Sequence, residues 1–213
     1  MTRPATRPLA VVFDVGGVIV QWQPLELMRR HFPSHARDEA DARAVLAQVT
    51  QSFAVEGDWA AFDCGRIEAD ELAARIAQRT PLPLPQVRTL IDAIPEHLQP
   101  MPEMVALLGR LGAAGRRLAL LSNMPRPYAD HLERQHRCFD AFEHRAWSGR
   151  LGVMKPQREI YDHVRERLGV DHASQLLFVD DHAGNVDAAR ALGWQALHFT
   201  SARDVIAALD QLA

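Results

Sequence analysis

Five polar side chains stand where short apolar runs of the sequence end. They are Asp14, Ser122, Asn123, Asp180 and Asp181. Lys155, in "GVMKPQRE", directly precedes Pro156, and proline is common at the first position of a helix. Each of these residues alone is typical of a turn, a helix cap or a solvated surface. Their occurrence together, at the ends of successive runs, indicates a functional site.

The chemistry available to this set is the transfer of a phosphoryl group. Three carboxylates in one small volume repel one another, and burial makes their charge still less favourable, so protons or a cation must compensate. Mg²⁺ fits because it binds one or two carboxylates together with phosphate oxygens and keeps several waters. Lys155 supplies a second positive charge, while Ser122 and Asn123 can donate hydrogen bonds to a bound anion. We therefore expect Mg²⁺ as the cofactor and a small-molecule phosphate ester as the partner.

The apolar runs predict the strands that would position these groups. Helical patterns lie between the runs, and Gly169 and Gly193 are expected to end two of the helices. Alternating strands and helices, with strands apolar on both sides, indicate an α/β fold: a parallel, Rossmann-like sheet with helices on both faces. In such a sheet, ligands bind beyond the carboxyl ends of the strands. The predicted strands are 9–14, 117–123, 175–181 and 194–200, and the helices are 102–111, 156–169, 185–193 and 202–212.

Residues 21–99 interrupt this alternation. The segment has no strand-like run, but it has helical patterns at 38–53 and 68–80, and the proline-spaced residues 80–87 are expected to separate two helices. We interpret it as an all-helical domain inserted after the first strand. The predicted domains are therefore a catalytic core of residues 1–20 and 100–213 and a helical cap of residues 21–99.

Composition excludes several classes of protein. The chain has 213 residues, of which 47% are hydrophobic and 24% charged, and its formal net charge of -3 gives no reason to expect nucleic acid as a partner. Cys64 and Cys138 stand far apart and are expected to be free thiols. We see neither a signal peptide nor an apolar stretch long enough for a membrane span. The expectation is a cytoplasmic protein without a membrane partner, either a monomer or a homodimer.

Taken in order, four segments resemble the motifs of the haloacid dehalogenase-like hydrolase superfamily. They are "FDVGGVIV", "LLSNMP", "GVMKP" and "FVDDHAGNVDAARALGW", and the match spans residue 9 to about residue 200. The helical insert is similar to the C1-type cap of that superfamily. The resemblance extends to its sugar-1-phosphate phosphatase-like branch.

The resemblance implies a role for each carboxylate. Asp14 would attack phosphorus and form an aspartyl-phosphate that water then hydrolyses, which is covalent catalysis. Mg²⁺ would be bound by the Asp14 carboxylate, the backbone carbonyl of Gly16 and Asp181. Asp180 would lie close by, either as a further ligand of the ion or as a residue that contacts the ligands.

It also implies how the phosphate would be bound. Ser122 and Asn123 would bind the transferring phosphoryl oxygens, and Lys155 would neutralise both the phosphate and Asp14. Gly17 would let the backbone approach the ligand closely, because glycine has no side chain in the way. Trp59, in the cap, either stacks on the substrate or packs in the core of the cap.

The sequence departs from the superfamily at one position. The usual second aspartate of the first motif, the general acid and base, is replaced by Gly16. Loss of a positioned acid or base typically lowers the rate by a factor of about 10² to 10⁴. Members of the sugar-1-phosphate phosphatase-like branch are similar in having glycine there. Either the leaving group needs little protonation, or water or a cap residue supplies the proton; Asp58 and Asp63, on either side of Trp59, are the candidates in the cap.

The sequence thus predicts a Mg²⁺-dependent phosphatase of small phosphate monoesters, such as sugar phosphates. One alternative is a 2-haloacid dehalogenase, which uses a similar aspartate without a divalent metal; the doublet of Asp180 and Asp181 argues against it. The other is a catalytically weak member of the family that binds phosphoesters or a partner protein, with Gly16 as the lesion. A dinucleotide-binding module is excluded because "DVGGVIV" lacks G-x-G-x-x-G.

Overall fold

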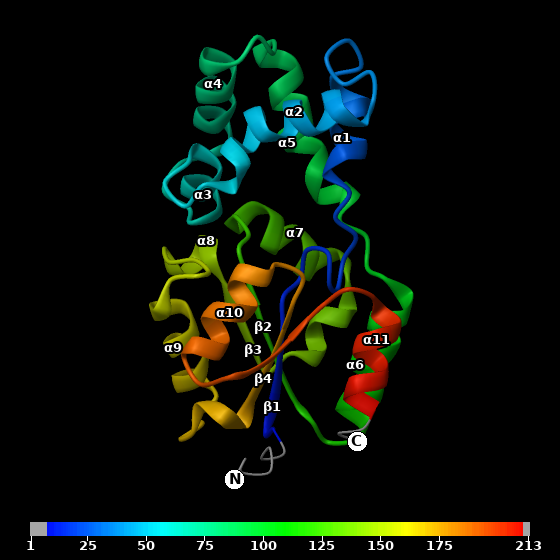
Figure 1. The fold of residues 1–213 in the computed structure, drawn as a ribbon, viewed down its shortest axis with the longest axis vertical. Coiled ribbons are helices and arrows are strands. Elements are labelled where there is room, and N and C mark those ends of the chain that lie inside the picture. The colour runs from blue at the N-terminus through cyan, green and yellow to red at the C-terminus, as the bar shows by residue number, and fades with distance from the viewer. Residues whose placement is uncertain (1–7, 211–213) are drawn as a thin grey trace.

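The computed structural model describes residues 8–210 and has two bodies, one above the other in Figure 1. The lower body contains a five-stranded, fully parallel sheet in the order β3-β2-β1-β4-β5. This order puts β1 in the centre, between the strands that end at Ser122 and Asp180. The strands are β1 Ala10–Phe13, β2 Arg117–Ser122, β3 His144–Trp147, β4 Leu176–Asp180 and β5 Gln195–His198.

Both faces of the sheet are buried, as the apolar runs predict. Along β1, Val11 and Phe13 pack on one face, and Ala10 and Val12 pack on the other. The first face is covered by α6 (Pro102–Ala113), α7 (Arg126–Gln135) and α11 (Ala202–Asp210), and the second by α9 (Arg158–Arg167) and α10 (Ala183–Ala191). Because side chains alternate along a strand, a strand covered on both faces is apolar at every position.

The upper body lies between β1 and α6 in the sequence, and its named elements are all helical (Figure 1). They are α1 Pro24–His31, α2 Glu39–Thr50, the 3₁₀ turn η1 Gln51–Phe53, α3 Asp58–Asp63, α4 Ala69–Arg79 and α5 Leu84–His97. The two connections to the sheet run side by side: the amide of Gln21 donates to the carbonyl of Gln99, and that of Met101 donates to Ile19. We call residues 21–99 the cap and the remainder the core.

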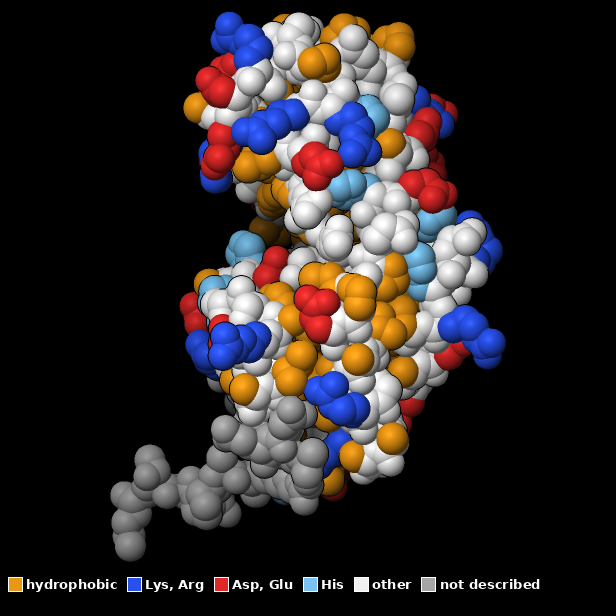
Figure 2. Space-filling model, turned by 90° about the vertical axis from the view of Figure 1, so that its right-hand side faces the viewer, with side chains coloured by type: hydrophobic (Ala, Val, Ile, Leu, Met, Phe, Trp, Pro, Cys, Tyr) orange, Lys and Arg blue, Asp and Glu red, His pale blue; other side chains and the backbone are white. Residues whose placement is uncertain are grey.

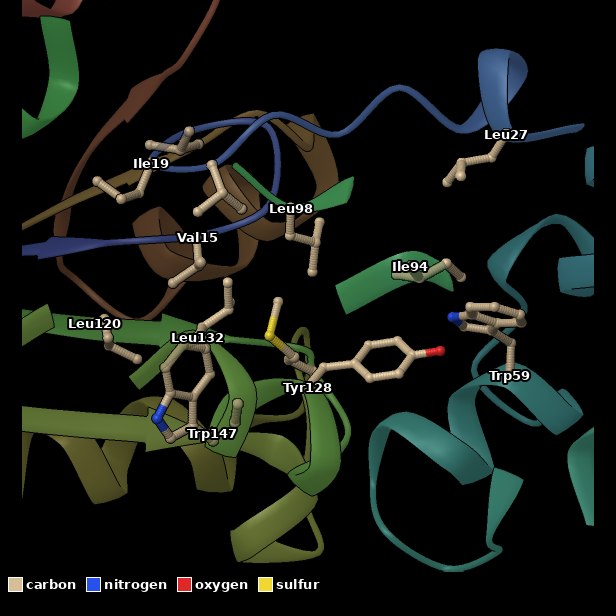
Figure 3. Close-up of a cluster of buried hydrophobic side chains, with 14 of the residues drawn as sticks. Val15, Ile19, Leu27, Trp59, Ile94, Leu98, Leu120, Tyr128, Leu132 and Trp147 are labelled. Atoms are coloured by element: carbon tan, nitrogen blue, oxygen red, sulfur yellow. The ribbon is translucent and has the colours of Figure 1, made fainter. Parts of the chain in front are cut away.

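The cap also contacts the core through side chains. The Tyr128 hydroxyl of α7 donates to the carbonyl of Ile91 in α5 at 2.7 Å, and Ser148 donates to the carbonyl of Asp63 in α3 at 2.5 Å. Figure 3 shows Tyr128 extending from the core toward Ile94 and Trp59 of the cap. One hydrophobic cluster runs through both bodies. The cap is therefore packed directly over the carboxyl ends of the strands.

The structure differs from the sequence-based expectation in several local features. Helix α9 begins at Arg158, so Pro156 does not start it as predicted. Strand β3 was not predicted, because it is short, lies at the edge of the sheet and begins with His144 and Arg145, which are half-buried. Helix α5 begins at Leu84, inside the segment expected to separate helices, with a proline in its first turn. Helix α10 begins two residues earlier than predicted.

Other local expectations are confirmed. The α9 and α10 helices are followed by Gly169 and Gly193, both with positive φ. Both cysteines are free thiols. Among residues 8–210, none of the helices is both long enough and apolar enough to cross a membrane.

Candidate active site

The predicted site residues meet at the edge of the sheet that faces the cap. Asp14 directly follows β1, Ser122 ends β2 and Asp180 ends β4. A cavity of about 390 Å³ lies above them, between core and cap. Its lining includes seven of the predicted residues: Asp14, Gly16, Trp59, Ser122, Asn123, Lys155 and Asp181. Of the other two, Asp180 accepts a hydrogen bond from Lys155, and Gly17 lies against the carboxylate of Asp181.

Lys155 joins two of the three carboxylates. Its Nζ lies 2.8 Å from Oδ1 of Asp14 and 2.6 Å from Oδ2 of Asp180, and its side chain is 1% exposed. Burial alone would lower the pKa of Lys155, but the two carboxylates raise it above its ordinary value. The lysine therefore stays charged, and it supplies one positive charge for three carboxyl groups.

The carboxyl group of Asp14 is short of compensating charge. Its pKa is raised from 3.8 to about 7 because it is buried; Lys155 opposes this, while Asp180 and Asp181 add to it. The pKa of Asp181 is raised as well, by burial and by Asp180. Each of the three carboxylates offers an oxygen within 4.8 Å of the others. Such a cluster holds either extra protons or a cation.

Asp180 is the most fully bonded of the three. It is completely buried and accepts hydrogen bonds from Lys155, from the backbone amide of His182 and from the side-chain amide of Asn185. Its oxygens thereby fix the positions of the lysine and of the start of α10. Sequence reasoning missed Asn185. The available signal was an asparagine four residues after the acidic doublet, at the start of the alanine-rich helix.

Asn123 has a role that the sequence did not predict. Its amide nitrogen donates to the carbonyl of Lys155 at 2.9 Å, and its amide oxygen accepts from the backbone N–H of Lys155 at 2.8 Å. The side chain therefore clamps the backbone of the lysine, with one amide N–H left over for a ligand. Ser122 is buried and lines the cavity directly.

The two glycines after Asp14 act differently. Gly17 has a φ of +73°, and a Cβ at this position would overlap the carboxylate of Asp181. Its first effect is thus to make room for Asp181, whereas the sequence suggested close approach to the ligand. Gly16 lines the cavity, and a Cβ there would meet no atom within 4 Å.

The cap aspartates lie in different surroundings. Asp58 accepts hydrogen bonds from Arg75 and Arg79 at 3.0 Å each, inside the cap, and these partners lower its pKa in spite of partial burial. Asp63 lines the cavity, and burial raises its pKa well above the ordinary value, with Lys155 only partly opposing the shift.

Trp59 is 5% exposed and lies at once in the cap core and in the cavity wall. Its ring packs edge-on against Phe62, with the ring centres 6.2 Å apart. The two alternatives for this side chain, substrate contact and core packing, are therefore compatible.

The comparisons with known proteins agree with this geometry. A family model described as haloacid dehalogenase-like hydrolase matches residues 8–193. The chain belongs to this family of hydrolases, which are enzymes. In the structural comparison, a haloacid dehalogenase family enzyme of Bacteroides thetaiotaomicron, in complex with magnesium and inorganic phosphate, superposes with a TM-score of 0.67 at 20% identity, over 90% of this chain and 93% of that chain.

Two curated relatives are phosphatases. A sesquiterpene phosphatase, astK, of Aspergillus oryzae is 29% identical over 203 residues, 95% of each chain. An enolase-phosphatase E1 of Nocardia farcinica is 32% identical over 181 residues, covering 76% of this chain and 71% of that protein. An L-2-haloacid dehalogenase of Xanthobacter autotrophicus has a similar fold, with a TM-score of 0.66 at 23% identity over 90% of this chain and 77% of that one.

Proposed function

We propose that this hydrolase is a Mg²⁺-dependent phosphatase that cleaves small phosphate monoesters through an aspartyl-phosphate on Asp14. The observation that carries the proposal is the group of three carboxylates, within 4.8 Å of one another and served by a single ammonium group. With three ionised carboxylates and one ammonium group the site has a formal charge of -2, which one divalent cation would cancel. The two phosphatase relatives support the same reaction.

The donor set fits Mg²⁺. Asp14 and Asp181 face the cavity and would bind the ion through carboxylate oxygens, together with the carbonyl of Gly16; Asp180, whose oxygens are already bonded, would orient these ligands. Bound there, the ion would neutralise charge on the phosphate and fix its orientation. Lys155 adds a positive charge through its ion pairs with Asp14 and Asp180.

The reaction then has two steps. In the first, a carboxylate oxygen of Asp14 bonds to phosphorus while the bond from phosphorus to the ester oxygen breaks, and the alcohol leaves with a proton. In the second, water loses a proton and attacks phosphorus, the bond to Asp14 breaks, and inorganic phosphate is released. Ser122 would donate to the transferring oxygens, and Asn123 would act mainly by holding Lys155 in place.

Asp63 is the group that would donate the first proton and accept the second. It is in the cavity wall with Asp14, and its raised pKa keeps it protonated where an ordinary aspartate is ionised. Asp58, bonded to two arginines within the cap, is not suited to this role.

Activity on a reactive ester, p-nitrophenyl phosphate, tests the main proposal. Wild type is expected to turn the ester over with Mg²⁺ and to lose turnover with EDTA, and Asp14→Asn is expected to be inactive. Acid quenching during turnover should leave a phosphoryl group on the peptide that contains Asp14. Equal background rates for wild type and Asp14→Asn would contradict the proposal and favour a non-catalytic, phosphoester-binding protein.

A second set of variants tests the proton donor. Asp63→Asn is expected to slow the release of poor leaving groups, such as alkyl alcohols, by about 10² to 10⁴ while affecting p-nitrophenol little, since that leaving group needs little protonation. Asp58→Asn is the matched control. Because position 16 has room for a side chain, Gly16→Asp is expected to restore part of the activity that Asp63→Asn loses. An Asp63→Asn enzyme with unchanged selectivity would exclude Asp63 from this role.

Dehalogenation of a 2-haloacid is the second candidate. One observation favours it: a halide leaves without a proton, and Gly16 provides none. The same Asp14 would attack carbon. Chloride release from 2-chloropropionate that persists in EDTA would support this reaction over phosphate hydrolysis.

A further inference from the structure

The polar and apolar parts of the cavity are separated. The charged groups of the core, among them Asp14, Lys155 and Asp181, form its floor at the strand ends. The walls above are built from buried apolar or aromatic side chains of both bodies: Trp59, Ile94, Leu98, Met124, Tyr128 and Met154. The phosphate end of a substrate and the group that it esterifies would thus meet very different surroundings.

The cap brings little to the cavity that could recognise hydroxyl groups. Among the described lining residues, Asp63 is the only charged side chain that comes from the cap, and no arginine takes part. The hydroxyl of Tyr128 is already donated to the carbonyl of Ile91. A sugar would leave most of its hydroxyl groups without partners here, which is unfavourable for a buried ligand.

The mouth of the cavity is apolar on the side of the cap, whereas Asp181 and His182 are exposed on the side of the core. Phe53 and Val55 line it and are each 45% exposed, and they are two of the four large hydrophobic side chains that are exposed within residues 8–210. Figure 2 shows an indentation between cap and core with hydrophobic side chains inside it. Exposed apolar side chains grouped at a cavity indicate a binding surface.

The apolar surface continues beyond the mouth. A second depression, about 610 Å³ in volume, lies along the cap between α1 and α2 and shares Trp22 and Phe53 with the first. Leu25 and Leu46 are in its wall, while Glu26 and Arg43 are its charged lining residues. The two depressions therefore adjoin at Trp22 and Phe53.

The backbone at the junction is strained. Gln51, Ser52 and Phe53 have φ values of 51°, 53° and 55°, a left-handed run without glycine. This conformation is unfavourable for residues other than glycine, and strain of this kind concentrates at ligand-binding segments. Here the run places Phe53 between the two depressions.

We propose that the esterified group of the substrate is an extended apolar chain, such as a long alkyl or isoprenoid alcohol, which fills the cavity and runs past Trp22 and Phe53 along the cap. This inference rests on the proposed phosphatase function and narrows its substrates from small phosphate esters in general to esters of apolar alcohols.

A homologous series of n-alkyl phosphates from ethyl to dodecyl, below their micelle concentrations and with Mg²⁺, tests the proposal. Each methylene buried in the path is expected to raise kcat/KM about three- to fourfold, the equivalent of about 0.8 kcal/mol, until the path is filled. The kcat/KM values for glucose 1-phosphate and glycerol 3-phosphate are expected to be at least a hundredfold below that for octyl phosphate. No dependence on chain length, or a preference for the sugar phosphate, would overturn the inference while leaving the phosphatase in place.

A binding measurement separates this inference from the reaction itself. The tryptophan fluorescence of Asp14→Asn, titrated with the same phosphates, is expected to give a Kd that falls with chain length. Length-dependent binding by wild type and variant, without turnover of any ester, would refute the phosphatase and retain the apolar site. Length-independent binding would refute the apolar site.

The matched pair Phe53→Ser and Leu84→Ser tests the path. Leu84 is 48% exposed and lies at the start of α5, outside both depressions. Phe53→Ser is expected to lower kcat/KM for octyl phosphate tenfold or more, so that kcat/KM rises less with chain length. Leu84→Ser is expected to keep the wild-type dependence on chain length. Equal behaviour of the two variants would show that the chain does not pass Phe53.

Discussion

Without a metal, the Asp14→Asn variant is expected to gain stability relative to wild type as the pH rises. In the folded protein, burial raises the pKa of Asp14 from 3.8 to about 7. Between these two values the unfolded chain has an ionised Asp14 and the folded protein a protonated one, so the folded state binds more protons. Wild-type stability therefore falls as the pH rises toward 7 and levels off above it. Asparagine has no such titration.

The size of the effect follows from the two pKa values. Stability changes by about 1.4 kcal/mol per pH unit while one proton separates the two states, which gives about 4 kcal/mol over the whole interval. Between pH 5 and pH 8 the difference between variant and wild type should grow by about 2.5 kcal/mol. In a chain of this size, that corresponds to roughly 5–10 °C in Tm.

Urea denaturation in EDTA at pH 5, 6, 7 and 8 measures the difference directly. Using the difference between two proteins removes the pH dependence of groups that do not interact with residue 14. Asp171→Asn, at an exposed position, is the control and should show no comparable trend. A constant difference between Asp14→Asn and wild type would refute the reasoning, because Asp14 would then ionise in the folded protein as it does in the unfolded chain.

Three further predictions concern the same site. Gly17→Ala should weaken Mg²⁺ binding and lower kcat at least tenfold, because the Cβ of the alanine overlaps Asp181. The control is Gly115→Ala, at a φ of +71° with open space around it, which should cost about 1 kcal/mol of stability and retain activity. Asn123→Leu should lower kcat about ten- to hundredfold because it releases the backbone of Lys155, an effect of the size seen for residues that support a metal site. Steady-state kinetics measures this change, and an unchanged kcat would contradict the prediction. Saturating Mg²⁺ should raise the wild-type Tm more at pH 8 than at pH 5.5, since below a pH of about 7 the ion must displace a proton from Asp14. An equal rise in Tm at the two pH values would contradict this prediction.

Much of the sheet could be predicted because its central strands are buried on both faces. The apolar runs of β1, β4 and β2 (after Arg117 at its start) end abruptly at Asp14, Asp180 and Ser122, so both the strand and its polar terminus are visible in the sequence. The edge strand β3 has no such contrast, since His144 and Arg145 at its start are half-buried.

The contacts that tune the site could not be predicted, because they join distant segments. Asn123 holds Lys155 across 32 positions of the sequence, and neither residue signals the other. Asp58 and Asp63 lie five positions apart beside the same tryptophan, yet one pairs with arginines and the other faces the cavity. Only the packing of α3 against α4 and the core decides between them.

Calorimetric titration of Mg²⁺ at pH 8 into wild type and Asp181→Asn tests the central claim, that the carboxylates share one divalent ion, most directly. Asp181 reaches the cluster from the cavity side, and its removal leaves the ion pairs of Lys155 intact. The account predicts one ion bound per wild-type chain and binding weakened at least tenfold in the variant. Equal affinity in the two proteins, or no binding by wild type with phosphate present, would contradict it.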